Sequence, residues 1–100
     1  MLAIRFKIRC QPGKTEQAMA VMQDVIAPSR QLDGVVHFDI GRDILEPDCL
    51  IATEVFEDRD ALDRQEGQPE VSKVMALLPG VLAEPPEATI FHVSSAEPAM

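Results

Sequence analysis

Aromatic side chains and positive charge are both scarce in this sequence. Its 100 residues include no tryptophan or tyrosine and only four phenylalanines, so platforms for stacking nucleic-acid bases are few. Nine lysines and arginines stand against 17 aspartates and glutamates, which gives a net charge of −8. Affinity for nucleic acid depends mainly on neutralising phosphates with basic side chains. We therefore expect no nucleic-acid partner.

Long apolar runs are also missing. Arg5, Lys7 and Arg9 alternate with apolar residues near the N-terminus, where a secretory signal would carry an unbroken apolar segment. No stretch of the sequence is apolar for long enough to cross a bilayer. We expect a soluble, cytoplasmic protein without a membrane partner.

The sequence carries few residues that bind metals or cofactors. Cys10 and Cys49 match neither a Cys-x-x-Cys redox pair nor a zinc spacing, and two thiols in a cytosolic protein are ordinarily reduced. His37 and His92 have no further ligands at metal-binding spacing. No glycine-rich phosphate loop supports a nucleotide cofactor. We predict no metal and no bound cofactor.

Apolar residues, at 46% of the sequence, suffice for one domain with a thin core. Alternation of apolar and polar residues, or short β-branched runs between turn signals, predicts four strands over residues 2–10, 35–40, 49–57 and 88–93.

Helical spacing of apolar residues predicts two helices between these strands. The first begins at Thr15, and Pro28 should kink or end it. Asp58 or Asp60 is placed to cap the second helix, which should break near residues 67–69 and end its regular part at Pro79-Gly80.

The order strand, helix, strand, strand, helix, strand is typical of the α+β ferredoxin-like fold with an antiparallel sheet. In its usual sheet order the first and third strands are central neighbours, which would bring Cys10 close to Cys49, so a disulfide under oxidising conditions is an open alternative. We expect one domain over residues 1–94 and a flexible tail over residues 95–100, where few large apolar residues remain.

Several phrases, in this order and spacing, resemble the antibiotic biosynthesis monooxygenase family, a group within the dimeric α+β barrel superfamily. They are Gln11-Pro12-Gly13-Lys14, Pro28-Ser29-Arg30 with Asp33-Gly34, Glu54-Val55-Phe56-Glu57-Asp58 with Ala61-Leu62, and Glu84-Pro85-Pro86. The resemblance implies a homodimer, a dimeric α/β barrel whose two sheets pack face to face. It also implies a pocket between each sheet and its own helices.

On that fold, one sheet face would line a mostly apolar pocket. We expect it to comprise Ile4, Phe6, Ile8, Val36, Phe38, Ile40, Ile51, Thr53, Val55, Phe91 and Val93, with Met19, Met22, Val74, Met75 and Leu78 from the helices. The candidate substrate-binding residues are Phe6, Phe38, Thr53, Met75 and Phe91. The alternative is that these residues simply fill the core.

The opposite face would carry Arg5, Lys7, Arg9, His37, Asp39, Glu54 and His92, mixed with Val35, Leu50, Ala52, Phe56 and Ile90. Ion pairs across a dimer interface would explain these charges. The sharper alternative is a charged catalytic cluster, in which His37, His92 and the carboxylates Asp39 and Glu54 act as acids or bases.

The second helix departs from the family pattern. Many members carry a histidine where this chain has Gln65, and often another where it has Glu70. The residues that haem-degrading relatives use correspond to Phe6, Gln65 and Met75, none of which could take the same role. Gln65 remains a candidate catalytic residue because its amide could hydrogen-bond the substrate.

The sequence is compatible with two main functions. The resemblance implies a monooxygenase that oxidises a small electron-rich aromatic, of quinol or anthrone type, with O2 and no cofactor. The alternative is a non-catalytic dimeric module that binds an apolar or aromatic small molecule or has an interaction role. An isomerase or decarboxylase acting on a polyketide-like ring has less residue-level support.

Overall fold

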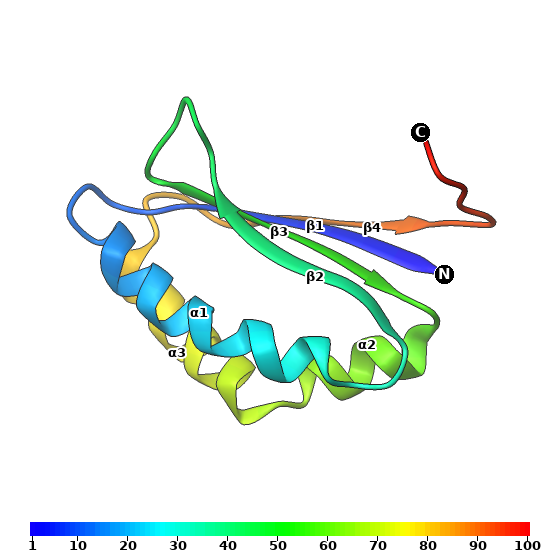
Figure 1. The fold of residues 1–100 in the computed structure, drawn as a ribbon. Helices are drawn as coiled ribbons and strands as arrows, with labels where there is room; N and C mark the ends of the chain where they lie inside the picture. The colour runs from blue at the N-terminus through cyan, green and yellow to red at the C-terminus, as the bar shows by residue number, and fades with distance from the viewer.

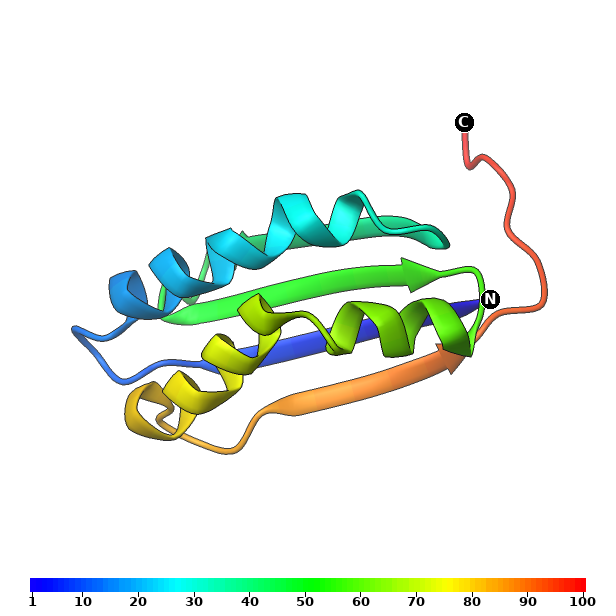
Figure 2. The same cartoon turned by 90° about the horizontal axis from the view of Figure 1, so that it is seen from below.

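The computed structural model describes residues 1–100 and has one sheet covered on one face by helices (Figures 1 and 2). Along the chain, the elements are β1 Leu2–Arg9, α1 Thr15–Arg30, β2 Val35–Arg42, β3 Cys49–Phe56, α2 Arg59–Glu66, α3 Pro69–Val81 and β4 Glu87–His92. No helix is long and apolar enough to cross a membrane.

All neighbouring strands of the sheet are antiparallel, in the order β2-β3-β1-β4. This order confirms the predicted ferredoxin-like α+β fold, with β1 and β3 at the centre. After β4, residues 93–100 form no strand or helix, and the C-terminus lies on the side of the sheet away from the helices (Figure 1).

Local sequence signals explain most element ends. The Asp58 carboxylate accepts a hydrogen bond from the Ala61 N–H (2.9 Å) and caps α2, as predicted. The break before Pro69 is also confirmed, since α3 begins at that residue. Pro28 does not end α1, which continues to Arg30, and α3 likewise includes Pro79 and ends at Val81. Both prolines lie in the last turns of their helices, where one lost hydrogen bond disturbs little of the helix.

Gly34, between α1 and β2, packs against the start of α2. Its φ of +84° is in the left-handed region, and a Cβ there would come within 2.7 Å of the Ala61 Cβ. Only glycine meets both conditions. This turn therefore allows α1 and α2 to lie on the same face of the sheet.

The register decides which strand residues face the helices, because directly opposed residues in an antiparallel pair share a face. Ile4 on β1 faces the helices and pairs with Glu54 on one side and Ile90 on the other. Thr53 pairs with Arg5, and Phe91 pairs with Ala3, so both lie on the outer face.

The predicted faces of β3 and β4 were therefore wrong by one residue. The residues predicted to face the helices but found on the outer face are Ile51, Thr53, Val55 and Phe91. Those predicted outside but found on the helix side are Val35, Leu50, Ala52, Glu54, Phe56, Ile90 and His92. Val36 lies at a bulge in β2 and is exposed.

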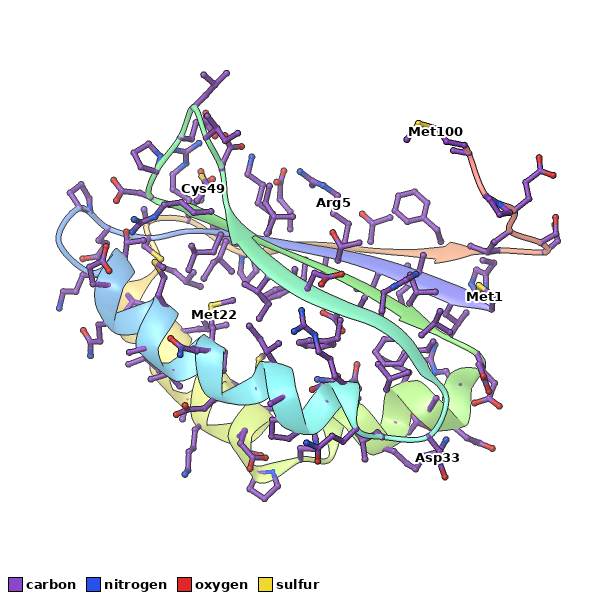
Figure 3. All side chains as sticks on the ribbon, in the orientation of Figure 1. Met1, Arg5, Met22, Asp33, Cys49 and Met100 are labelled. Atoms are coloured by element: carbon purple, nitrogen blue, oxygen red, sulfur yellow. The ribbon has the colours of Figure 1, made fainter.

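The core lies between the sheet and the helices. Ile8, Leu50 and Phe56 from the strands are almost fully buried, as are Leu62 and Val81 from the helices. Met22 points from α1 toward the sheet, whereas Arg5 points away from the helices (Figure 3). The helix-facing side of the sheet thus forms the core, whereas the outer face carries both charged and apolar side chains.

Both cysteines are buried and free. Cys49 on β3 lies opposite Arg9 on β1 in the sheet. The backbone N–H of Cys10, the residue after Arg9, donates a hydrogen bond to the Asp48 carbonyl. Cys10 packs in the core, whereas the Cys49 thiol donates to the Glu46 carboxylate on the other side (3.5 Å). The structure thus contains no Cys10–Cys49 disulfide. Burial raises the pKa of both thiols.

Candidate functional site

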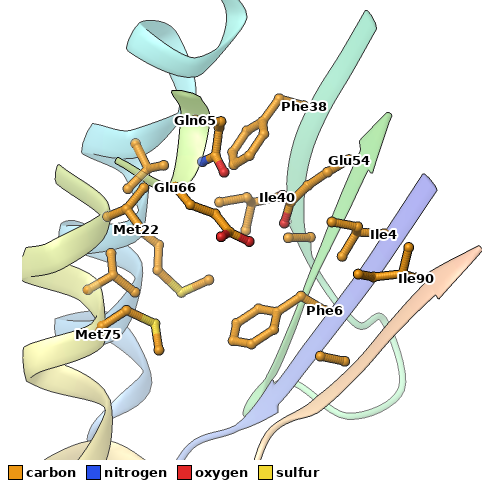
Figure 4. A pocket seen from close by; sticks show the side chains of 15 residues that line it. Ile4, Phe6, Met22, Phe38, Ile40, Glu54, Gln65, Glu66, Met75 and Ile90 are labelled. Atoms are coloured by element: carbon orange, nitrogen blue, oxygen red, sulfur yellow. The ribbon is translucent and has the colours of Figure 1, made fainter. Parts of the chain in front are cut away.

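A cavity of about 480 Å³ lies between the sheet and the helices. Its walls are mostly apolar, as is usual for small-molecule sites. Figure 4 shows the lining side chains, which are Ile4, Phe6, Met22, Val25, Phe38, Ile40, Ala52, Glu54, Gln65, Glu66, Val71, Val74, Met75, Ala88 and Ile90. The expected pocket is thus present, and the alternative of a completely filled core is wrong.

The cavity is closed at one side and open at the other. Beneath α1, the side chains of Met22, Val25 and Phe38 are buried. Along the edge strand β4, Ile90 is 41% exposed, and on α3 Met75 is 56% exposed. The mouth therefore lies between β4 and the helices α2 and α3.

Glu54 is the ionisable side chain that β3 directs into this cavity (Figure 4). Its opposite neighbours are Ile4 on β1 and Phe38 on β2, so the strands beside it are apolar. Burial raises the pKa of Glu54 from 4.5 to about 7, and the Glu66 carboxylate adds a smaller effect in the same direction. Near neutral pH, Glu54 can therefore either accept or donate a proton.

Glu66, at the last position of α2, extends into the same cavity from the helix side (Figure 4). It is exposed at the mouth, whereas Glu54 is partly buried. Two carboxyl groups on opposite walls disfavour simultaneous ionisation. Because Glu54 is the more buried of the two, its charged form is the one that is disfavoured.

Gln65 is 4% exposed and held by a hydrogen-bond chain. Its Nε2 donates to the Ser29 Oγ (3.2 Å), and the Ser29 hydroxyl donates to the Gln68 Oε1 (3.0 Å). The Gln65 oxygen lies on the cavity side of the amide (Figure 4). This chain ties α1 to the junction of α2 and α3 and fixes the orientation of the amide.

The structure brings together four of the predicted site residues. Phe6, Phe38, Gln65 and Met75 all line the cavity. The other four, Thr53, Phe91, His37 and His92, do not.

Thr53 and Phe91 are on the outer face, as is His37, which pairs with Val55. His92 pairs with Leu2, which places it on the helix side at the end of β4, outside the cavity lining. Neither histidine is therefore among the side chains that line the cavity. No group of three or more histidine, cysteine or acidic side chains could hold a metal ion.

Sequence reasoning missed Glu66 and placed Glu54 on the outer face of the sheet, away from the cavity that it lines. Hydrophobicity alone favoured Thr53 over Glu54 for the pocket, because a carboxylate on a buried face is normally costly. The available signal was the apolar residue opposite each position, but using it required the register of β1 against β3.

Comparisons with known proteins agree with this fold. The sequence model of the antibiotic biosynthesis monooxygenase family matches residues 1–77. An uncharacterized protein of Synechocystis sp. is 27% identical over 96 residues, which is 96% of this chain and 65% of that protein. The chain thus spans slightly less than two thirds of this relative's length.

Solved structures show the same fold at low sequence identity. The chain is similar to a candidate antibiotic biosynthesis monooxygenase from Nitrosomonas europaea, with a TM-score of 0.88, 17% identity and coverage of 95% of this chain and 100% of the other. It also resembles Rv0793 from Mycobacterium tuberculosis, with a TM-score of 0.84, 22% identity and coverage of 99% and 98%. From the match of the family model over most of its length, the chain belongs to the antibiotic biosynthesis monooxygenase family.

Proposed function

We propose that this protein oxidises a small electron-rich aromatic, of quinol or anthrone type, with O2 in the cavity beneath its helices. The observation that carries the proposal is Glu54, a carboxyl group with a pKa of about 7 in an apolar cavity large enough for an aromatic ring system. A base that titrates near neutral pH is matched to removing a proton from a phenol or an anthrone.

The reaction balances without an external reductant. Glu54 removes a proton from the substrate, and the resulting anion passes one electron to O2. The superoxide and the substrate radical then combine to form a carbon–oxygen bond, and the peroxide takes up a proton. Loss of water then converts a ring CH2 group, which an anthrone has and a quinol has in its keto tautomer, into a carbonyl group. The substrate supplies all four electrons that reduce O2 to the carbonyl oxygen and one water.

The apolar walls suit this chemistry in two ways. Phe6, Phe38 and Met75 present surfaces against which a flat ring can pack. Excluding water also strengthens the few polar interactions that remain, so the position of the Glu54 carboxyl group relative to the ring matters more than it would in water.

Oxygen uptake by the purified protein tests this proposal. We expect folded protein to consume O2 with at least one member of a quinol and anthrone panel, and heat-denatured protein not to. Glu57→Gln is a matched control for Glu54→Gln, because Glu57 follows the same strand but is exposed and outside the cavity. Saturable ligand binding without oxygen uptake would instead support the non-catalytic binding module.

We further propose that the outer face of the sheet packs against a second copy of the chain. Phe91 on this face is 52% exposed. The turn between β2 and β3 presents Ile44 and Leu45 almost fully exposed, and it rises on the side of the sheet away from the helices (Figure 1). Exposed apolar side chains such as these favour association with a partner that covers them. Light scattering at micromolar concentration should give the dimer mass, and a monomer mass would contradict the proposal.

A further inference from the structure

All three polar side chains in the cavity offer hydrogen-bond acceptors to its interior. Glu54 and Glu66 present carboxyl oxygens from opposite walls. Gln65 turns its amide oxygen to the cavity, because its nitrogen is engaged by Ser29. When Glu54 is ionised, nothing in the lining donates a hydrogen bond from a side chain.

No positive side chain balances these acceptors, since the lining contains no lysine, arginine or histidine. The arginines on neighbouring elements are engaged elsewhere. Arg64 donates to the Asp33 carbonyl (2.8 Å). Arg30 donates to the Phe38 carbonyl (2.8 Å) and pairs with Asp39 (2.8 Å), which lies on the outer face. The cavity lining therefore carries two carboxyl groups and no positive side chain.

We infer that the cavity selects aromatic ligands that carry hydroxyl groups but no carboxylate, and that Glu66 at the mouth enforces this selection. This inference takes from the proposed function that an aromatic ring occupies the cavity, but it does not require that the ring be oxidised.

The physical reason is that donors and negative charges have opposite effects here. A ligand that enters the cavity displaces water from the acceptor oxygens in its lining. A hydroxyl group on the ring can replace that water by donating a hydrogen bond to one of these oxygens. A carboxylate on the same ring finds no donor and meets Glu66 as it enters through the open side between β4 and the helices. Selection thus comes from repulsion of the wrong ligand as much as from attraction of the right one.

Three probes with one ring system separate charge from size. They are 2-naphthol, 6-hydroxy-2-naphthamide and 6-hydroxy-2-naphthoate, of which the last two have nearly the same shape. Because the chain has no tryptophan or tyrosine, naphthalene fluorescence can be followed with little protein background. Dissociation constants would be measured at pH 8 for the wild type, Glu66→Gln and Asp60→Asn. Asp60 is an exposed acidic residue of α2 outside the cavity lining.

We expect the naphthol and the amide to bind wild-type protein, and the carboxylate to bind about tenfold or more weakly than the amide. In Glu66→Gln, the ratio of the dissociation constants of the carboxylate and the amide should fall by about threefold or more. In Asp60→Asn this ratio should be unchanged.

Three results would overturn the inference: equal affinity for the carboxylate and the amide, the same ratio in Glu66→Gln as in wild type, or no binding of any probe. A protein that shows the expected selectivity but consumes no O2 would support the inference while refuting the proposed reaction. The two claims can therefore fail separately.

Discussion

Glu54 and Glu46 are only eight residues apart in the sequence, yet their pKa values differ from that of an ordinary glutamate in opposite directions. Glu54 lies on β3 facing the cavity, and burial raises its pKa to about 7. Glu46 lies in the turn before β3, where hydrogen bonding to Arg9 is the largest influence that lowers its pKa. The Arg9 Nη2 lies 3.1 Å from a Glu46 oxygen, and the Lys7 Nζ lies 3.5 Å from it.

The alternation of β1 produces this difference. Arg5, Lys7 and Arg9 all point to the outer face, while Ile4 and Phe6 point into the cavity. The sheet therefore separates the basic residues of its central strand from Glu54. A glutamate is therefore an ion-pair partner on the outer side of the sheet, as Glu46 is, and a candidate base on the cavity side, as Glu54 is.

The largest expected effect is on catalysis. Glu54→Gln keeps the shape of the side chain but removes its basicity, so oxygen uptake with a quinol or anthrone substrate should fall by about a hundredfold or more. Initial rates at pH 8 measure this loss. Glu46→Gln, which removes an acid from the other side of the sheet, should retain the wild-type rate. Equal losses in both variants would show that the comparison has no catalytic meaning.

The next effect is on stability. Because the folded-state pKa of Glu54 is raised, the native state binds more protons than the unfolded state between about pH 4.5 and 7, and the free energy of unfolding falls as pH rises through this window. Glu54→Gln avoids that loss. We expect the variant to be more stable than wild type at pH 8 by about 2 kcal/mol, after discounting for partial exposure, and nearly equal at pH 5.

Urea unfolding at both pH values measures this difference. A variant that is destabilised by the same amount at pH 5 and pH 8 would mean that Glu54 is not strained by burial in the native state.

A third prediction is that a cation placed in the cavity lowers the pKa of Glu54, as Arg9 and Lys7 lower that of Glu46. Ile90 shares the neighbour Ile4 with Glu54 and is exposed at the mouth, so it can be replaced with limited cost to the core. Ile90→Lys should lower the pKa of Glu54 by about one unit. The pH profile of kcat/KM should shift down by the same amount, with Ile90→Met as the uncharged control. An identical shift in Ile90→Met would remove charge as the cause.

The smallest expected effect is at Glu46. Its ion pairs with Arg9 and Lys7 are substantially exposed, and such pairs contribute little to stability. Glu46→Gln should lower Tm only slightly at pH 7. The difference should disappear as pH falls below the usual range of a glutamate, because the stabilisation from a lowered pKa is lost when the carboxyl group becomes protonated. Thermal melts at pH 7 and pH 3.5 provide the check.

The fold could be predicted from the sequence because the patterns that indicate its helices and strands each involve residues close together in the chain. The alternation in β1, the Asp58 cap and the break at Pro69 each depend on neighbouring residues, and together with the order of the elements they indicated the topology. The α1 helix extended past Pro28 because its tertiary packing continues to Ser29, which is fully buried.

The site was only partly readable because it depends on register. In β3, Leu50 and Ile51 are both apolar, so the sequence does not show which of the two faces the helices. Choosing the face with Thr53 gave the less polar pocket, and the pairing of Ile4 with Glu54 reverses that choice. Phe6, Phe38, Gln65 and Met75 were placed correctly because β1, β2 and the helices have clearer polar and apolar sides.

The most direct test of this account is the pKa of Glu54 itself, measured by NMR titration of glutamate side-chain carboxyl carbons, with the Glu54 signal assigned from its absence in Glu54→Gln. We expect a midpoint at about pH 7, and a lower midpoint in Glu66→Gln. A midpoint near 4.5, unchanged by Glu66→Gln, would contradict the claim that this cavity holds a base matched to neutral pH.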